Sequence, residues 1–496
     1  MNILLISSVV LVVTYLIIKW FKDQHKTPLP PGPGLLECLK ITWRMMRKND
    51  IHLMSADLCR RYGEIFNIKI FSENIVMLNS SRVIRKVLLS SQYRDLTNDR
   101  PPTFVKKHLI YDGHDIVLRN FDLFHVKLRK IVHRSMKLYG DGVHVFEDMV
   151  KNETKNLQNH LETSNKTCID LDRALTVSLI RVLHILLTNE APIDTKDVCE
   201  TIEEYDHFIN IIFKSSNNMV LTKCPWVRFV PGSLRQMWIN TKNAQNRLND
   251  LYLNPTIIER MKSHGKGILG NILNEAVDDD EIDGDCIKGI LSNMVVAGYL
   301  TTKGALSGFF LLMLYYPDIQ HRIQEEIDEY IGRNRDPNLD DRSVMHYTNS
   351  AILECLRFIS HIPLGIPHMN REEIEVEGMR IPANATIICN LWMMAHSDQV
   401  WNNPDSFLPE RFLDDAGKLL PAEHPLRAQF IPFGTGRRNC VGESFAKSRI
   451  FLYVTSLLQK FTFSPGENKL APLDPATWKP NAAMQPDFLN CCVHTR

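Results

Sequence analysis

The sequence lacks the cysteine patterns that mark zinc sites or a disulfide framework. Its eleven cysteines are an odd number, no pair has Cys-x-x-Cys spacing, and only Cys491 and Cys492 are adjacent. Neither a zinc finger nor a small disulfide-stapled scaffold is therefore indicated. This cysteine usage instead fits a reducing compartment and one thiol with a special role.

An excess of charge of one sign is also missing. The chain has 58 Lys+Arg and 57 Asp+Glu, which gives a net charge of +1. The charge balance indicates neither a nucleic-acid partner nor an acidic tail, and any basic surface must be local. Four Asn-x-Ser/Thr sequons begin at Asn79, Asn152, Asn165 and Asn384, but the membrane orientation argued below leaves them unglycosylated.

A second linker, repeats and low-complexity tracts are absent from residue 35 onward, which favours one large globular unit. Helical periodicity predicts helices at 51–62, 81–91, 124–138, 146–161, 170–187 and 198–213. Strand-like segments are few, and two hairpins are expected, one from 65–70 with 75–78 and one from 373–381 with 385–390. The predicted fold class is mainly α with a small β-sheet region.

The first residues form a candidate transmembrane anchor. Residues 3–18 are largely apolar and would span about 24 Å as a helix, and Lys19, Lys22 and Lys26 all follow the run, which directs the bulk of the protein to the cytosol. A cleaved signal peptide is the weaker alternative, because no basic segment precedes the run. The expected organisation is an anchor at 1–22, a basic and proline-rich hinge at 23–34, and a catalytic domain at 35–496.

One cysteine near the C-terminus lies in a glycine-flanked turn that suits a haem. Cys440 follows Arg438 and precedes a helix-like run, with Gly436 and Gly442 on either side. The glycines let the backbone approach a flat ligand, the helix start favours an anion on sulfur, and the arginine can meet a propionate. A buried, inert cysteine beside a turn is the alternative.

Phe433, Gly436, Arg438, Cys440 and Gly442 together match the pattern Phe-x-x-Gly-x-Arg-x-Cys-x-Gly. The segment closely resembles the haem-binding loop of the cytochromes P-450. The resemblance implies the cytochrome P-450 fold, a haem b and Cys440 as the axial thiolate.

A long apolar helix is expected at 286–316, stopped by Pro317. Within it, Ala297 and Gly298 open a groove where a flat cofactor or O₂ could sit, and the segment resembles the distal helix of the same family. Thr301 matches the threonine that the family uses in oxygen activation. Leu300 stands where the family has an acid, and a leucine cannot carry a proton.

A second pair of motifs supports the resemblance. Glu354 and Arg357 lie three apart, and Arg411 follows within Pro-Glu-Arg-Phe, as in the family's buried charge network, whose role is structural. Further cations expected at the haem propionates are Arg129, His125, which replaces the usual tryptophan, and His368.

The resemblance implies a microsomal monooxygenase in the endoplasmic reticulum membrane that inserts one atom of O₂ into a lipophilic substrate of the steroid, fatty acid or xenobiotic class. Electrons would come from NADPH through cytochrome P-450 reductase, with cytochrome b5 as a second candidate partner. Leu300 leaves two alternatives open: a haem-thiolate isomerase or peroxide-rearranging enzyme that needs no reductase, and a non-catalytic haem-binding protein.

The sequence also indicates candidate contacts with the membrane, the substrate and the reductase. Residues 219–238, which mix tryptophan, phenylalanine and basic side chains, suit either a membrane interface or a core-packed loop. The substrate pocket is expected between 101–119, 294–301, 362–366 and 482–484. A reductase-docking surface is expected to comprise Lys127, Lys130, Arg134, Lys447 and Arg449.

Overall fold

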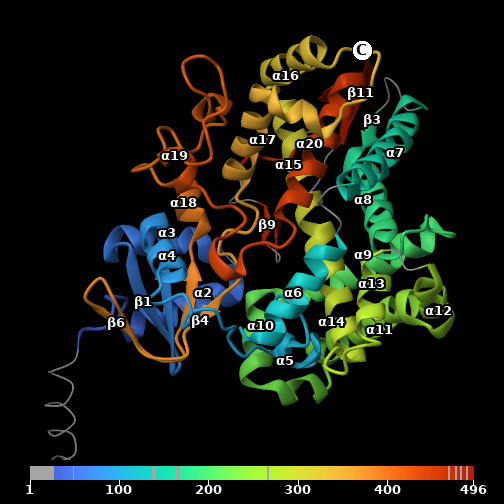
Figure 1. Cartoon of the computed structure of the whole chain (residues 1–496). Coiled ribbons are helices and arrows are strands. Elements are labelled where there is room, and N and C mark those ends of the chain that lie inside the picture. Colours follow the sequence, from blue (N-terminus) through green and yellow to red (C-terminus); the bar gives the residue numbers. More distant parts are fainter. Residues whose placement is uncertain are drawn as a thin grey trace, which may run out of the picture.

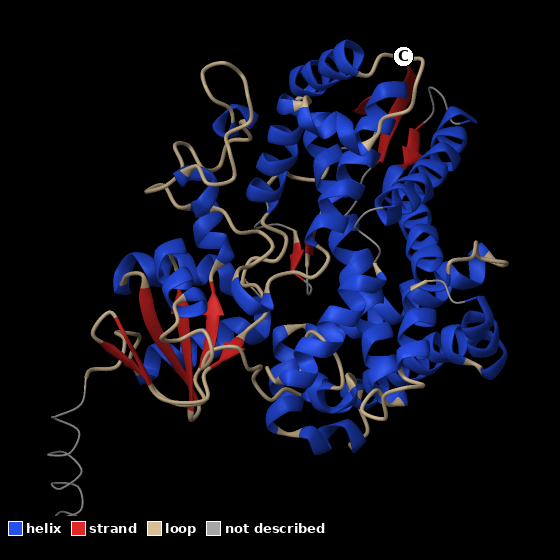
Figure 2. Cartoon of the chain, in the orientation of Figure 1, coloured by secondary structure: helices blue, strands red, loops and turns tan. Residues whose placement is uncertain are grey.

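The computed structural model describes residues 27–48, 50–136, 141–163, 168–264, 267–466, 470–474, 478–480, 483–486 and 490–496. The predicted anchor and the first four residues of the predicted hinge lie outside the described residues. Where the chain is described, helices dominate and strands are short (Figure 2). The mainly α fold with a small sheet region is confirmed.

Helices build the larger part of the molecule, to the right and top of Figure 1. The α-helices are α2 (Leu35–Lys48), α3 (Ile51–Tyr62), α4 (Ser81–Leu89), α5 (Phe104–His108), α6 (Leu123–Ser135), α7 (Asp141–Thr163), α8 (Leu171–Thr188), α9 (Thr195–Phe213), α10 (Ser215–Lys223), α11 (Ser233–Leu253), α12 (Pro255–His264), α13 (Ile268–Glu275), α14 (Gly284–Val295), α15 (Thr301–Tyr315), α16 (Pro317–Tyr330), α17 (His346–Ile359), α18 (Leu391–His396), α19 (Pro425–Gln429) and α20 (Glu443–Lys460). Tighter turns are η1 (Tyr111–Gly113), η2 (Pro225–Phe229), η4 (Leu339–Ser343), η5 (Pro409–Phe412) and η6 (Gly436–Arg438).

The six helices predicted from periodicity are all present, with ends shifted by a few residues. Capping explains some of the shifts. The carboxylate of Asp122 accepts the His125 N–H at 2.6 Å and starts α6 at Leu123, because an aspartate at this position satisfies an amide that the helix leaves unpaired. This cap sets the register of α6 and therefore the direction of His125 and Arg129.

The main sheet lies at the lower left of Figure 2 and has the strand order β1-β2-β7-β4. The strands of the described chain are β1 (Ile65–Ile70), β2 (Glu73–Leu78), β3 (Cys168–Asp170), β4 (His368–Met369), β5 (Ile374–Val376), β6 (Met379–Ile381), β7 (Thr386–Cys389), β8 (Phe461–Pro465), β9 (Lys479–Pro480), β10 (Met484–Gln485) and β11 (Asn490–Thr495). The hairpin expected from 65–78 is confirmed, with Ile65 opposite Leu78.

The second expected hairpin is wrong. β5 pairs with β6 inside the segment that was predicted as one strand, while β7 runs parallel to β2 and antiparallel to β4. The reason is the turn at Glu377 and Gly378, which have φ of 53° and 71°. Two successive residues in the left-handed region close a two-residue hairpin, and the chain reverses there.

The long apolar helix is interrupted once. α14 and α15 are joined by η3 (Val296–Leu300), a single π-helical turn. The combined segment Gly284–Tyr315 is the only helix in the described chain that is long and apolar enough to cross a membrane, and most of it is buried inside the protein. It is therefore the core helix of the domain. Pro317 ends this segment as predicted and also begins α16.

Gly289 in α14 makes a closer backbone contact than any side chain would allow. A Cβ built there would lie 2.1 Å from the carbonyl oxygen of His114, whereas a Cβ at Gly284 in the same helix would meet nothing within 4 Å. The loop 111–119 is thus held directly against α14. Its carbonyl groups matter for the site described below.

We expect Gly289→Ala to lower the free energy of unfolding by about 2 kcal/mol or more, because the loop or the helix must move. Gly284→Ala is the matched control, and it should leave stability unchanged or raise it by up to about 1 kcal/mol, because alanine favours the helix. Thermal or urea denaturation of the two variants measures this. Equal effects would contradict the close contact.

Candidate functional site

The cysteine loop is closed by its own backbone. The Cys440 N–H donates to the carbonyl of Phe433 at 2.8 Å. Gly434 and Gly436 have φ of 72° and 78°, a conformation that favours glycine. A Cβ at Gly436 would also lie 2.9 Å from the Leu88 carbonyl. Gly436 is thus required by the turn and by its packing on α4.

Gly442 differs from Gly436. It precedes α20 with a φ of −94°, and the nearest atom to a Cβ there would be Cys440 Sγ, at 4.0 Å. Neither backbone conformation nor protein packing requires a glycine at this position. Its presence fits a bound group that lies close to the loop.

The Cys440 thiol is not ionised by its surroundings alone. The Cys440 side chain is exposed, but desolvation by the atoms around it raises the pKa of its thiol, and the Gly442 amide at the start of α20 lowers it by less. The expectation that the helix start would favour a thiolate therefore describes the smaller of two opposing effects. Coordination to a metal deprotonates such a thiol outright.

Two arginines and a histidine lie beside the cysteine loop. Arg129 Nη2 of α6 donates to the Asn439 carbonyl at 2.6 Å. Arg438 Nη2 donates to the Val117 carbonyl at 2.7 Å, and its Nη1 is buried without a hydrogen-bond partner. His125 Nε2 lies 3.1 Å from the Ile116 carbonyl, and its Nδ1 is likewise buried and unpartnered. The structure therefore brings together three of the cations expected from the sequence.

A third arginine joins this group and was missed by the sequence analysis. Arg100 is buried, and its guanidinium donates to the carbonyls of Val117, Ile366 and Pro367 at 2.8–3.0 Å. It lies in a loop between Thr97 and Pro101, and no spacing motif marks it. His368, which was expected here, is buried with Nδ1 at 2.9 Å from the Thr97 carbonyl.

The positive charge of the cation cluster, defined as Arg100, Arg129, Arg438, His125 and His368, comes from its three arginines, because burial lowers the pKa of both histidines. The buried Asp115 carboxylate offsets part of this charge. Burial and the neighbouring Arg438 lower the pKa of Arg100, and burial lowers the pKa of Arg438 to about 10. Arginines keep their charge in proteins. No ion pair joins these three arginines to a carboxylate among the described residues.

Whether a haem fits this site can be judged by comparing its charge with the excess of buried positive charge. Two propionate carboxylates would supply the missing anions and would meet the unpartnered Nη1 of Arg438. Burial lowers the pKa of His125 to about 3, so the ring is neutral. With Nε2 donating to the Ile116 carbonyl, Nδ1 is an acceptor and would not donate to a carboxylate. The residues present thus fit a flat dianionic group beside Cys440.

A buried ion-pair network holds the chain segment that precedes the cysteine loop. Arg357 binds Glu354 with two hydrogen bonds of 2.7 and 2.8 Å, and both side chains are fully buried. Arg411 Nε donates to the same carboxylate at 3.1 Å. The remaining guanidinium protons of Arg357 go to the carbonyls of Ala395, Pro404 and Ser406. The segment leading to the loop is thereby held against α17.

The π-helical turn in the core helix contains one exposed residue, Ala297. Its two neighbours in the chain are half-buried, and the residues beyond them are buried. The Thr301 hydroxyl donates to the Ala297 carbonyl at 2.6 Å, while Leu300 is buried. A Cβ at Gly298 would meet only Leu183, at 3.5 Å, so protein packing does not require glycine there. A π-turn often marks a functional site in a helix.

Arg449 was predicted to lie on a docking surface, and this is wrong. The side chain is buried, and Nη2 donates to the Gly298 carbonyl at 2.5 Å and also contacts the Thr302 hydroxyl. The carbonyl groups of a π-turn are incompletely paired within the helix, so they can accept a guanidinium. Arg449 therefore connects α20 to the interruption in the core helix.

The other four predicted docking residues do lie at or near the surface. Lys130 is exposed. Three bind nearby carboxylates: Lys127 to Asp279 and Glu281, Arg134 to Glu275, and Lys447 to Glu443.

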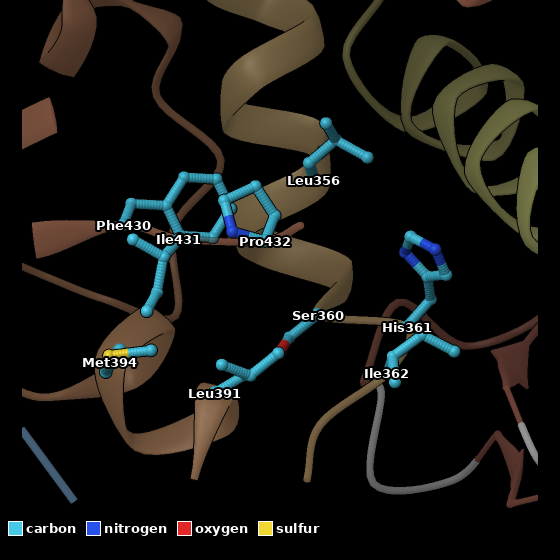
Figure 3. A pocket seen from close by; sticks show the side chains of 9 residues that line it. All are labelled: Leu356, Ser360, His361, Ile362, Leu391, Met394, Phe430, Ile431 and Pro432. Carbon is cyan, nitrogen blue, oxygen red and sulfur yellow. The ribbon is translucent and has the colours of Figure 1, made fainter. Parts of the chain in front are cut away.

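A mostly apolar pocket borders the chain that leads into the cysteine loop. Its lining comes from the end of α17, the following turn, α18 and the residues before Phe433 (Figure 3). Those residues are Leu356, Ser360, His361, Ile362, Leu391, Met394, Phe430, Ile431 and Pro432. Two of the predicted substrate walls meet nearby, since the Met484 N–H donates to the His361 carbonyl at 2.7 Å. Ala482 lies outside the described residues.

Truncating Arg357 should be far more costly than truncating a surface arginine. Arg357→Leu leaves Glu354 as a buried and only partly paired charge, and we expect a loss of about 3–5 kcal/mol of stability together with poor haem retention. The control is Arg322→Leu, whose pair with Glu410 is half exposed and should contribute at most about 1 kcal/mol. Denaturation curves and haem content measure both. Similar losses in the two variants would refute the structural role of the network.

Comparison with known proteins places the whole chain in one family. Residues 30–487 match the family described as Cytochrome P450. Vitamin D(3) 25-hydroxylase of Sus scrofa is 28% identical over 461 residues, which cover 90% of this chain and 89% of that protein. Steroid 17-alpha-hydroxylase/17,20 lyase of Rana dybowskii is also 28% identical, with 90% and 86% covered. Cytochrome P450 2D4 of Rattus norvegicus is 29% identical, with 89% and 88% covered.

A solved structure shares the fold. A zebrafish cytochrome P450, determined with abiraterone, superposes with a TM-score of 0.74 at 23% identity and covers 90% of this chain and 100% of its own. Since the family match spans nearly the entire sequence, the chain belongs to the cytochrome P450 family, whose members bind a thiolate-ligated haem, and it is an enzyme of the P450 monooxygenase type.

Proposed function

We propose that this enzyme inserts one atom of O₂ into a lipophilic substrate of the steroid, fatty acid or xenobiotic class, using electrons from NADPH. Cys440 would ligate the iron of a haem b, and the cation cluster would bind the propionates. A thiolate-ligated haem supplies the chemistry of oxygen activation when bound. The chain's own part is to position the substrate, exclude water and deliver protons.

The observation that carries the oxygenase proposal is the placement of Thr301. Its hydroxyl is at the C-terminal side of the π-turn, bonded to the carbonyl of the exposed Ala297. A hydroxyl held in this way can accept a proton from water and pass one on. With leucine at position 300, proton delivery would run through Thr301 and water without a carboxylate.

The proposed substrate class rests on the relatives. Two of the relatives are named for hydroxylation of vitamin D(3) and of a steroid. A steroid-sized apolar substrate is therefore the first to test, followed by fatty acids and xenobiotics.

We further propose attachment to the endoplasmic reticulum membrane through the anchor at 1–22 and the hinge at 23–34, with the catalytic domain at 35–496 in the cytosol. Exposed apolar side chains support a second contact: Leu35, Leu36, Leu39 and Trp43 on α2, and Trp226, Phe229 and Val230 at η2. α2 contacts α10, which directly precedes η2. Such a surface suits the membrane interface, so the membrane alternative for residues 219–238 is preferred.

The proposed electron donor is NADPH-cytochrome P-450 reductase, with cytochrome b5 as a second donor. Lys127, Lys130, Arg134 and Lys447 remain as candidate contacts, without Arg449. Three of them already bind carboxylates of this chain, so docking would have to exchange those pairs.

A second candidate function is favoured by Leu300. A haem-thiolate enzyme that isomerises a substrate or rearranges a peroxide needs neither a reductase nor an acid at this position. The alternative of a non-catalytic haem-binding protein is not retained, because the chain belongs to a family whose relatives are named as hydroxylases. Activity with added peroxide alone would support the rearrangement.

Replacing the proposed ligand should abolish thiolate ligation. The reduced, carbon-monoxide-bound protein is expected to show the Soret band typical of a thiolate-ligated haem, and Cys440→Ala should lose it. Cys355→Ala, at a buried cysteine of α17, is the control and should keep it. A thiolate-type band that persists in Cys440→Ala would rule out the assignment.

Removing the Thr301 hydroxyl should lower the amount of product formed for each NADPH consumed. We expect Thr301→Val to lower product per NADPH about tenfold or more, because general acid–base groups contribute at least this much. Thr302→Val is the neighbouring control and should keep the ratio, since its hydroxyl bonds Arg449. Product and NADPH consumption are measured together with reductase present. An unchanged ratio in Thr301→Val would contradict the proposed proton path.

A further inference from the structure

Three metal-ligating side chains of different chemistry meet at the first turn of α14. They are His114 from the loop 111–119, Asp283 from the residue before the helix, and Cys286 from the first turn. Their ligating atoms all lie within 4.8 Å of one another. None of the three belongs to the haem-side cluster or to the cysteine loop.

The helix cap explains why two of these side chains adjoin. Asp283 Oδ1 accepts the backbone N–H of Cys286 at 2.8 Å, which turns the carboxylate toward the side chain three residues on. Cys286 is buried, and its Sγ contacts the Glu281 carbonyl at 3.9 Å and hydrogen-bonds the Asp283 carboxylate. The thiol and the carboxylate are thus placed together by local structure alone.

The imidazole reaches this pair because its loop is packed on α14. Gly289 lets the His114 carbonyl approach the helix, and the Ile116 N–H donates to Asn293 Oδ1 of the same helix at 3.3 Å. His114 Nδ1 itself is covered and makes no hydrogen bond, although the side chain as a whole is 39% exposed and Asp283 Oδ2 lies 3.5 Å away. A buried ring nitrogen without a partner points to an ion or ligand that would satisfy it.

We propose that His114, Asp283 and Cys286 bind one thiophilic divalent cation, with Zn²⁺ as the expected ion. Zinc takes sulfur, nitrogen and oxygen ligands in tetrahedral sites, and three protein ligands leave one position for water. The ligands must approach one another by roughly 1 Å to reach the separations of such a site, which side-chain rotation can provide. The Cys286 thiol releases one proton on binding.

Local charge favours the cation. The thiolate and Asp283 carry two negative charges, which offset the unfavourable positive end of the α14 dipole. The acidic stretch before the helix adds Asp279 and Glu281, both bound to Lys127.

The site would connect α14 to the loop that holds the cation cluster. The Ile116 carbonyl contacts His125, and the Val117 carbonyl accepts from Arg100 and Arg438. A metal at His114 would fix this loop two residues before those carbonyls. Its expected effect is a more stable haem-bound protein, independent of the substrate or the reaction.

The test uses full-length, haem-loaded protein freed of metal by a chelator and titrated with Zn²⁺. Cys168→Ser is used as the background, because the Cys168 and Cys492 sulfurs lie 3.4 Å apart and would offer a competing thiol pair. We expect one Zn²⁺ per chain, a zinc K-edge spectrum with one sulfur ligand, and a higher thermal midpoint.

His114→Ala and Asp283→Asn should each weaken binding about 100-fold or more and abolish the thermal shift. Asp283→Asn keeps the helix cap, so an unchanged far-ultraviolet circular dichroism spectrum separates loss of a ligand from loss of the fold. His207→Ala, at an exposed histidine of α9, is the control and should bind normally. Absence of Zn²⁺ binding, a spectrum without sulfur, or equal affinity in all variants would overturn the proposal.

Discussion

Buried positive charge is the constraint on which the site depends. Arg100, Arg129 and Arg438 surround the cysteine loop and are held by backbone carbonyls, which accept hydrogen bonds but carry no full charge. Desolvation makes such a cluster costly unless anions complete it. The carbonyls come from the loop 111–119, the loop around Ile366 and the cysteine loop itself. A bound haem would thus act as a structural element as well as a cofactor: its propionates would neutralise charge that otherwise destabilises three separate loops at once.

A second constraint fixes the helix after Cys440 relative to the helix that carries Thr301. The π-turn between α14 and α15 leaves backbone carbonyls available, and Arg449 of α20 reaches one of them. α20 begins three residues after Cys440, so the helix that follows the proposed axial ligand is bonded to the helix that carries Thr301. The Glu354 network holds the approach to the loop in the same way from α17. Buried guanidinium groups that bind backbone carbonyls therefore fix the relative positions of helices that are distant in the sequence.

Local motifs were predictable because their chemistry is encoded within a few residues. The cysteine loop, the Glu354 and Arg357 pair and the hairpin 65–78 all follow from short-range spacing and turn geometry. Arg100 was missed because its role depends on carbonyls up to 267 positions away in the chain. Arg449 was misplaced because a charged residue on a helix is usually solvated, and only the break in the facing helix gives it a buried partner. The hairpin after 373 was mispaired because β7 finds a parallel partner more than three hundred residues earlier.

The sequence by itself determined the family, the mainly α fold, the candidate sulfur ligand and the absence of an acid at Leu300, because each depends on residue type at short spacing. The tertiary structure decided which arginines lie beside the cysteine loop, that Arg449 is buried, and that His114, Asp283 and Cys286 meet. These depend on burial and on contacts between segments far apart in the chain. Burial removes water from each polar group, and distant segments supply the hydrogen-bond partners that offset this cost, which local sequence does not encode.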